Sequence, residues 1–299
     1  IAKLQQRTER KLSRGDRWLQ SNLLDLSFDA TAARQTIQGM TPRYGSAMKN
    51  GEYRVLIGES VSRLAGGERD YHPDDYGRVH TPVTRLPREL RGCLSVEGEP
   101  LVGVDLANSQ PLILGMVIAK KRSLKKAEGR QAGGATLISS AESTESVNGK
   151  RVAGSRFGDV QEYLNLCESG RLYESLMSPG DDRTELKRAV FRDVFFGRPG
   201  IRSDLASRFS ERFPTVISEL RRMKRGNYKA ASHRMQRLES DIFIDSICGR
   251  IMRERPATPT TTIHDSILTT PAHIGYVRSV ITDEFERMGV RPTLHEERY

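Results

Sequence analysis

The chain has 299 residues, enough for one large domain or two of moderate size with a sizeable buried core, which excludes a small peptide-like scaffold. Hydrophobic residues make up 36% and charged residues 29% of it, proportions typical of a soluble globular protein and not of a membrane or fibrous one. The 48 lysines and arginines exceed the 38 acidic residues, and the resulting net charge of +10 favours a polyanionic partner such as nucleic acid, a basic surface kept for solubility being the alternative.

Three features of the sequence bear on the cellular compartment of the protein: the spacing of its cysteines, the length of its apolar runs and its N-terminus. The three cysteines are widely spaced and form no CxxC pair, which predicts a reducing compartment and neither a disulfide framework nor a zinc site. The longest apolar run, residues 112–119, is far shorter than the roughly 20 residues of a membrane span, so we expect no membrane partner. Ile1 is not an initiator and no signal peptide follows it, so we expect a piece of a longer product.

The first 75 residues predict a basic, largely helical region. Leucines, Trp18 and basic residues within 1–29 have the spacing of one or two amphipathic helices. Such a helix would either lie along a nucleic-acid backbone or pack on a core through its apolar stripe. Residues 39–75 are rich in Gly, Tyr and Arg with little periodicity, and predict mixed loop and short helix.

The next part of the chain contains a candidate catalytic carboxylate. The apolar run 101–104 predicts a buried strand that ends at Asp105. Residues 120–155 begin with Lys-Lys-Arg and continue with small and polar residues, which predicts a flexible insertion outside the core.

A series of helices is predicted between residues 160 and 252. The pattern over 160–192 is helical, with a Pro-Gly break at 179–180 and an acidic helix start at 181–182. Amphipathic runs at 205–223 and 235–252 predict further helices.

A second candidate carboxylate lies in a predicted hairpin. Residues 261–270 alternate Thr, Ile and Leu around His264 and Asp265, which predicts two short strands and a tight turn, and residues 271–288 predict a helix ended by Gly289. If the two strands join one sheet, Asp105 and Asp265 could bind divalent cations for phosphoryl transfer. Either aspartate alone is more typical of a turn or cap residue.

Two cations and two aromatic rings recur every four residues in the predicted helix at 183–195. In an α-helix each such step advances about 40°, so all four side chains would share one face. That order suits a nucleoside triphosphate, with the cations on the phosphates and the rings on the sugar and base; the alternative is an ordinary amphipathic helix with its rings in the core. The residues are Arg183, Lys187, Phe191 and Phe195.

Three segments in this order resemble the motifs of family A DNA polymerases and the related phage-type single-subunit RNA polymerases. Val-Asp-Leu-Ala-Asn-Ser-Gln at 104–110 is similar to the first catalytic motif, and the helix at 183–195 is similar to the nucleotide-binding helix of the fingers. Ile-His-Asp-Ser at 263–266 is similar to the second catalytic motif. The resemblance extends from about residue 76 to the C-terminus.

The resemblance implies an α+β fold in which an antiparallel palm sheet is combined with a helical fingers subdomain. We expect a thumb-like or accessory region at 1–75, a first palm part at 76–119, the insertion at 120–155, fingers at 156–234 and a second palm part at 235–299.

It also implies a role for particular residues. Asp105 and Asp265 would hold two Mg²⁺ ions, Mn²⁺ being an alternative, with the carbonyl of Leu106 as a further ligand. Nucleotide binding would involve Arg183, Lys187, Phe191, Phe195 and Gln110. Contacts to the primer-template would involve Arg78, Thr81, Gln236 and His264.

The implied activity is template-directed nucleotide addition to a 3′-hydroxyl by a reduced DNA polymerase of a phage or mobile element. Its partners would be a primer-template, nucleoside triphosphates and a replication accessory protein, in the cytoplasm of a bacterial or phage-infected cell. Gln110 stands where the DNA polymerases carry Glu, which leaves the choice of sugar open. Ser266 also stands where they usually carry Glu; serine at this place is commoner in the RNA polymerases and favours ribonucleotide use, and Phe195 stands where Tyr is usual. The alternatives are a single-subunit RNA polymerase or primase, a non-catalytic nucleic-acid-binding replication subunit and, more weakly, a nuclease.

Overall fold

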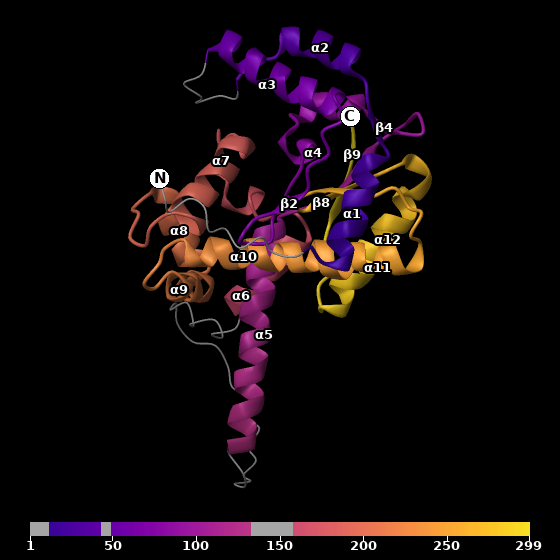
Figure 1. Ribbon diagram of the computed structural model, residues 1–299. Coiled ribbons are helices and arrows are strands. Elements are labelled where there is room, and N and C mark those ends of the chain that lie inside the picture. Colours follow the sequence, from indigo (N-terminus) through magenta and orange to yellow (C-terminus); the bar gives the residue numbers. More distant parts are fainter. Residues whose placement is uncertain (1–11, 43–48, 133–157) are drawn as a thin grey trace, which may run out of the picture. The chain divides into compact units, whose positions relative to one another are not determined.

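The computed structural model describes residues 12–42, 49–132 and 158–299, and it confirms the α+β class (Figure 1). The chain forms two compact units. The first comprises residues 1–107 and 236–299, and the second comprises residues 108–235. Residues 108–119, expected in the first palm part, fall in the second unit by this division.

The centre of the first unit is a four-stranded antiparallel sheet in the order β7-β8-β6-β9. The predicted strand before Asp105 and the predicted hairpin around residues 264–265 are confirmed, and they lie next to each other as β6 and β8. The last strand, β9, was not predicted, because its sequence Leu-His-Glu-Glu-Arg lacks apolar alternation. The strands are β6 (Val102–Leu106), β7 (Thr261–Ile263), β8 (Ser266–Thr269) and β9 (Leu294–Arg298).

The core of the first unit forms on one face of this sheet. Val104 and Ile267, both 0% exposed, lie opposite each other on β6 and β8, and therefore on the same face. Helix α12 (Ile274–Arg287) contacts β6 and β8. Its buried residues recur at the spacing of one helix face, so the predicted helix at 271–288 is confirmed, with a short 3₁₀ turn η5 (Pro271–His273) at its start.

The helix predicted at 235–252 is longer than expected and includes a π-helical segment. It consists of α10 (Ala230–Ser240), the π-helix η4 (Asp241–Cys248) and α11 (Gly249–Glu254), which follow one another without a break (Figure 1). The π-helical part buries five side chains, and α12 contacts it.

The N-terminal helices give one confirmed prediction and one correction. Helix α1 (Arg14–Leu24) buries Leu19 and Leu23 and contacts η4, α11 and β7, so its apolar stripe packs on the core. The prediction of mixed loop and short helix at 39–75 is wrong over α3 (Asn50–Ala65), a helix of 16 residues that packs on α2 (Ala30–Gly39). Ile57, Val61 and Leu64 give it a buried stripe, whose periodicity is obscured in sequence by neighbouring glycines.

Short elements connect these helices to the main sheet. A three-stranded antiparallel sheet has the order β1-β4-β5, and a separate hairpin pairs β2 with β3. The elements are β1 (Leu26–Phe28), β2 (His72–Pro73), β3 (Val79–His80), α4 (Pro82–Arg85), the 3₁₀ helix η1 (Arg88–Cys93), β4 (Leu94–Val96) and β5 (Glu99–Pro100).

The described part of the second unit is helical. Tyr163, Phe195, Phe209 and Phe213 form an aromatic cluster with ring centroids 5.2–6.2 Å apart. The elements are α5 (Ser109–Ala132), α6 (Gly158–Glu168), the 3₁₀ helix η2 (Glu174–Leu176), α7 (Arg183–Ala189), the π-helix η3 (Val190–Phe195), α8 (Asp204–Arg212) and α9 (Pro214–Met223).

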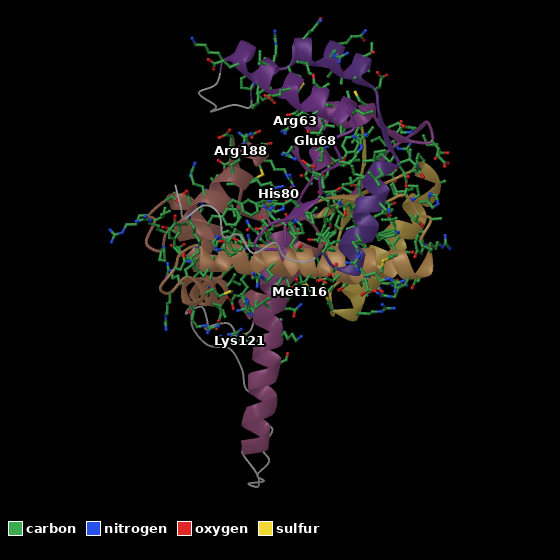
Figure 2. The ribbon with its side chains drawn as sticks, viewed as in Figure 1. Arg63, Glu68, His80, Met116, Lys121 and Arg188 are labelled. Carbon is green, nitrogen blue, oxygen red and sulfur yellow. The ribbon has the colours of Figure 1, made fainter. Side chains whose placement is uncertain are left out.

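Helix α5 corrects the prediction of a flexible insertion from residue 120. It continues to Ala132, because the Ala, Lys, Arg and Glu residues of this segment have high helix propensity. Lys121, labelled in Figure 2, forms a 2.7 Å ion pair with Glu219 of α9 and so ties this helix to its neighbour. The remainder of the predicted insertion, residues 133–155, lies outside the described residues.

Candidate active site

One candidate catalytic aspartate, Asp105, lies on strand β6 of the main sheet, and the other, Asp265, lies in the turn that leads into the neighbouring strand β8. Asp105, near the end of β6, lies opposite Ser266, the first residue of β8, and Asp265 directly precedes Ser266. The N–H of Leu106 donates a hydrogen bond of 3.3 Å to the carbonyl oxygen of Asp265. From the spacing of paired strands and of consecutive Cα atoms, the Cα atoms of Asp105 and Asp265 are within about 9 Å of each other.

Two residues near the aspartates in sequence adopt the left-handed backbone conformation. His264 has φ +56° and forms, with Asp265, the two-residue turn between β7 and β8. Asn108 has φ +54° and lies between β6 and α5. Only three described non-glycine residues have a positive φ, and such conformations are costly for side chains other than Asn. The backbone thus adopts a costly conformation at His264, the residue directly before Asp265.

His264 is a neutral imidazole at physiological pH. Burial, and then the charge of Arg78, lower the pKa of His264 to about 4. Its Nδ1 is buried and has no hydrogen-bond partner in the described part of the chain. The ring can therefore donate one hydrogen bond and accept another, but it does not carry a positive charge beside the two carboxylates.

Arg78 lies close to His264. Its guanidinium forms a 3.0 Å ion pair with Glu239 of α10, whose side chain is only 3% exposed. Arg78, Glu239 and His264 line one small cavity of about 10 Å³, which is roughly the space of a single water molecule. The structure therefore brings together Arg78 and His264, two of the four candidate primer-template residues.

The other two candidate primer-template residues lie elsewhere in the first unit. Thr81 is 2% exposed, and its hydroxyl accepts a 3.1 Å hydrogen bond from the N–H of Thr84 at the start of α4. This buried cap replaces the expected contact to nucleic acid with a structural role. Gln236 is partly exposed on α10.

The donor set fits magnesium better than a transition metal. Asp105 and Asp265 are half-buried and offer carboxylate oxygens, and the backbone of Leu106 lies beside Asp265. Mg²⁺ is usually held by one or two protein carboxylates, with water and substrate oxygens completing its shell. The described residues contain no cluster of three or more His, Cys, Asp or Glu side chains suited to a metal, so a cage made by protein side chains alone is not found there.

Strand β9 brings a histidine to Asp105 that sequence reasoning missed. His295 lies directly opposite Asp105 on β9, so the two side chains share one face of the sheet. It is exposed and follows Leu294 in a segment without a strand signal. Gly103, on the same face, allows Tyr299 to pack closely against β6, because a Cβ at this position would lie 2.7 Å from the Tyr299 hydroxyl oxygen.

The predicted nucleotide-binding cations are exposed on α7 in the second unit. Arg183 forms an ion pair with Glu174 and lies 5.6 Å from the ring centroid of Tyr173. The ammonium group of Lys187 is 5.8 Å from the same centroid. Among the described residues Lys187 has no ion pair, which leaves its charge available to an anionic ligand.

The two predicted nucleotide-binding rings do not continue the α-helical face. From Val190 the chain forms the π-helix η3, in which the N–H of Phe196 donates a 2.8 Å hydrogen bond to the carbonyl of Phe191. Phe195 is 3% exposed and packs against Phe209 at a centroid distance of 6.0 Å. The expectation that Phe195 faces a nucleotide is corrected: in this structure it is a core residue, while Phe191 is half-buried.

Gln110, the candidate sugar-selecting residue, lies in the first turn of α5 and is 8% exposed. It belongs to the second unit. A charged side chain at this position would therefore lose much of its hydration.

Comparison with known proteins does not assign the chain to a family. No model of a known protein family matches it, and no curated protein matches it. In the described ranges no helix has both the length and the apolar character needed to cross a bilayer.

Proposed function

We propose that this protein is a template-directed nucleotidyltransferase that adds nucleotides to a 3′-hydroxyl with the help of two Mg²⁺ ions. The observation that carries the proposal is the position of Asp105 on β6 beside Asp265 in the turn that precedes β8, each in a segment that resembles a catalytic motif of family A polymerases. The net charge of +10 supports a nucleic-acid partner.

The residues of the chain have distinct roles in this reaction. Bound Mg²⁺ would lower the pKa of the attacking hydroxyl and stabilise the leaving pyrophosphate. Asp105 and Asp265 would hold the cations on the rigid sheet, with the Leu106 carbonyl as a further oxygen ligand. His264, uncharged, would exchange hydrogen bonds with the primer end, and Lys187 and Arg183 would neutralise the triphosphate.

A primer-extension assay tests the proposal directly. The full chain is given DNA or RNA templates, a primer, and either deoxy- or ribonucleoside triphosphates, with Mg²⁺ or with a chelator. We expect incorporation in at least one Mg²⁺ arm and none with the chelator. Binding of primer-template without incorporation in any arm would contradict the proposal and favour a non-catalytic replication subunit.

The second candidate function is an RNA polymerase or primase. Ser266, which follows Asp265, is the residue commoner at this place in the single-subunit RNA polymerases that the chain resembles. The ribonucleotide arms of the same assay, run with and without a primer, distinguish this function from DNA synthesis.

Gln110 gives a prediction about sugar choice. We expect Gln110→Glu to increase the ratio of deoxy- to ribonucleotide incorporation, because a carboxylate at this site would disfavour a 2′-hydroxyl in the manner of the DNA polymerases the chain resembles. Since Gln110 is 8% exposed, the variant should also lose some stability. The ratio is measured by competitive incorporation, with Gln161→Glu, on an exposed glutamine of α6 in the same unit, as a control of matched charge that should leave the ratio unchanged. An unchanged ratio in Gln110→Glu would argue against Gln110 as the selecting residue.

A further inference from the structure

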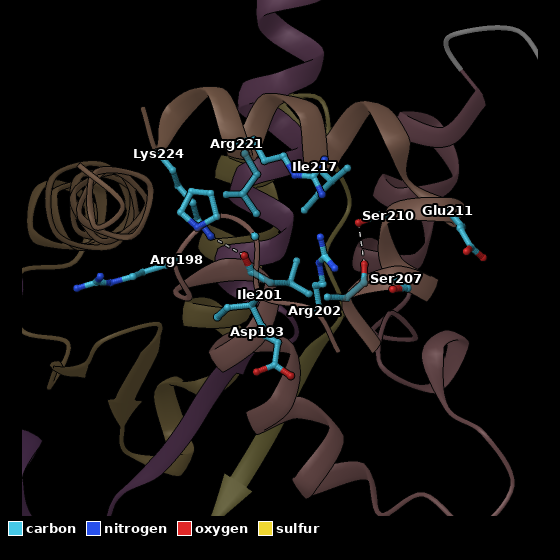
Figure 3. Close-up of a pocket in the computed structure, with 15 residues that line it drawn as sticks. Asp193, Arg198, Ile201, Arg202, Ser207, Ser210, Glu211, Ile217, Arg221 and Lys224 are labelled. Atoms are coloured by element: carbon cyan, nitrogen blue, oxygen red, sulfur yellow. Dashed lines mark hydrogen bonds between the residues drawn. The ribbon is translucent and has the colours of Figure 1, made fainter. Parts of the chain in front are cut away.

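A cavity of about 380 Å³ lies within the second unit, separate from the residues proposed for catalysis (Figure 3). Its walls come from the end of η3, the loop that follows it, α8 and α9. Its volume is in the range of sites that hold small molecules, about 300–1,000 Å³.

The lining of this cavity has more positive than negative charge. Four cationic side chains line it, against the two carboxylates of Asp193 and Glu211. Asp193 is already neutralised by a 2.7 Å ion pair with Arg192. In Figure 3 the carboxylates of Asp193 and Glu211 point outward from the space between the walls. The cations are Arg198, Arg202, Arg221 and Lys224.

Two of these cations have no polar partner among the residues that the structure describes. The guanidinium groups of Arg202 and Arg221 make no hydrogen bond or ion pair with any described residue, and Figure 3 shows both projecting into the space between the walls. Arg198, by contrast, points away and lies 5.2 Å from the ring centroid of Tyr228. Planar guanidinium groups bind phosphate oxygens in a bidentate manner. Because the guanidinium groups of Arg202 and Arg221 have no other polar partner among the described residues, they favour a phosphate group as ligand.

Lys224 fixes the wall beside these arginines. It is 5% exposed, and its Nζ donates hydrogen bonds of 2.7 Å to the carbonyl of Val194 and 2.9 Å to that of Gly197. Burial, and then the charge of Arg221, lower the pKa of Lys224 to about 8. The cations thus repel one another in the described structure, and a bound anion would relieve that repulsion.

We propose that this cavity binds a phosphate group through Arg202 and Arg221. The hydroxyl of Ser207, an exposed lining residue, offers a further donor, and Ile201, Ile217 and Leu220 form an apolar wall for the organic part of the ligand. The phosphate belongs either to a free nucleotide or to a nucleic-acid backbone, because the recognising chemistry is the same. This inference concerns the second unit alone and does not depend on the proposed catalytic function.

Binding of defined probes to the full chain tests the proposal. The probes are inorganic phosphate, adenosine 5′-monophosphate and a short single-stranded DNA without terminal phosphates, each titrated by calorimetry. The test variants are Arg202→Gln and Arg221→Gln, and the matched control is Arg225→Gln, which removes the same charge from an exposed position outside the cavity. All three arginines are exposed, so the variants should fold, which thermal unfolding verifies.

The outcomes separate the two sources of phosphate. We expect each test variant to weaken binding about tenfold or more, and the control to leave it nearly unchanged. A loss confined to inorganic phosphate and the monophosphate assigns the cavity to a free ligand, and a loss confined to the DNA assigns it to a nucleic-acid backbone. Equal losses in all three variants, or no measurable binding of any probe to the unmodified protein, would overturn the proposal.

Discussion

We expect Asp265→Asn to lower Mg²⁺-dependent incorporation about a thousandfold or more, which corresponds to roughly 4 kcal/mol of lost transition-state stabilisation. The substitution keeps the size of the side chain but removes the charge that a divalent cation requires. Because Asp265 lies in the turn beside β6, where the Leu106 N–H binds its backbone carbonyl, the backbone contact survives the change. The loss is measured as initial rate at saturating primer-template.

Two further variants make this result specific. Asp105→Asn should produce a loss of similar size, because in the proposed reaction the two carboxylates hold the same pair of cations and their effects are not additive. Asp25→Asn, on an exposed aspartate at the end of α1 in the same unit, should retain the rate of the unmodified protein. If Asp265→Asn or Asp105→Asn retained full synthesis, the catalytic assignment would be wrong.

We expect Phe195→Ala to destabilise the folded protein by about 3–5 kcal/mol, the usual cost of removing a large buried ring. Phe195 is 3% exposed, and its ring contacts those of Phe191 and Phe209 at centroid distances of 5.6 and 6.0 Å. The truncation leaves a cavity in the aromatic cluster that unites η3 with α8. The free energy of unfolding is obtained from urea titrations followed by circular dichroism.

Phe196→Ala provides the comparison for this measurement. Phe196 is 36% exposed, and we expect its truncation to cost about 1 kcal/mol or less. If Phe195→Ala left the unfolding free energy unchanged and instead raised the KM for nucleotide, Phe195 would be a binding residue, as the sequence pattern alone had suggested.

The sequence predicted the elements whose side-chain pattern is regular and local. The strand before Asp105, the hairpin around residues 264–265 and the helix at 271–288 were all predicted, because buried positions in them recur with the period of a strand or a helix. The helix α3 and the continuation of α5 were missed, since glycines and runs of charged residues conceal a helical period.

Two features of the candidate site depend on contacts that no local pattern encodes. The π-helical turn at η3 changes the direction of Phe195, and the aromatic cluster that buries this ring comes from α6, α8 and the loop that follows α8. Strand β9 is polar and has no strand signal of its own, yet pairing with β6 places His295 opposite Asp105. Its partner in the sheet, not its own sequence, makes this segment a strand.

By itself, the sequence predicted the local elements that carry Asp105 and Asp265, because periodicity and residue chemistry are properties of short segments, and its resemblance to the polymerase motifs implied the α+β class. Tertiary structure alone decided that those carboxylates become neighbours, that Phe195 enters the core and that Arg202 and Arg221 share a cavity. The physical reason is that strand register and side-chain packing depend on residues far apart along the chain, which meet only when the chain folds.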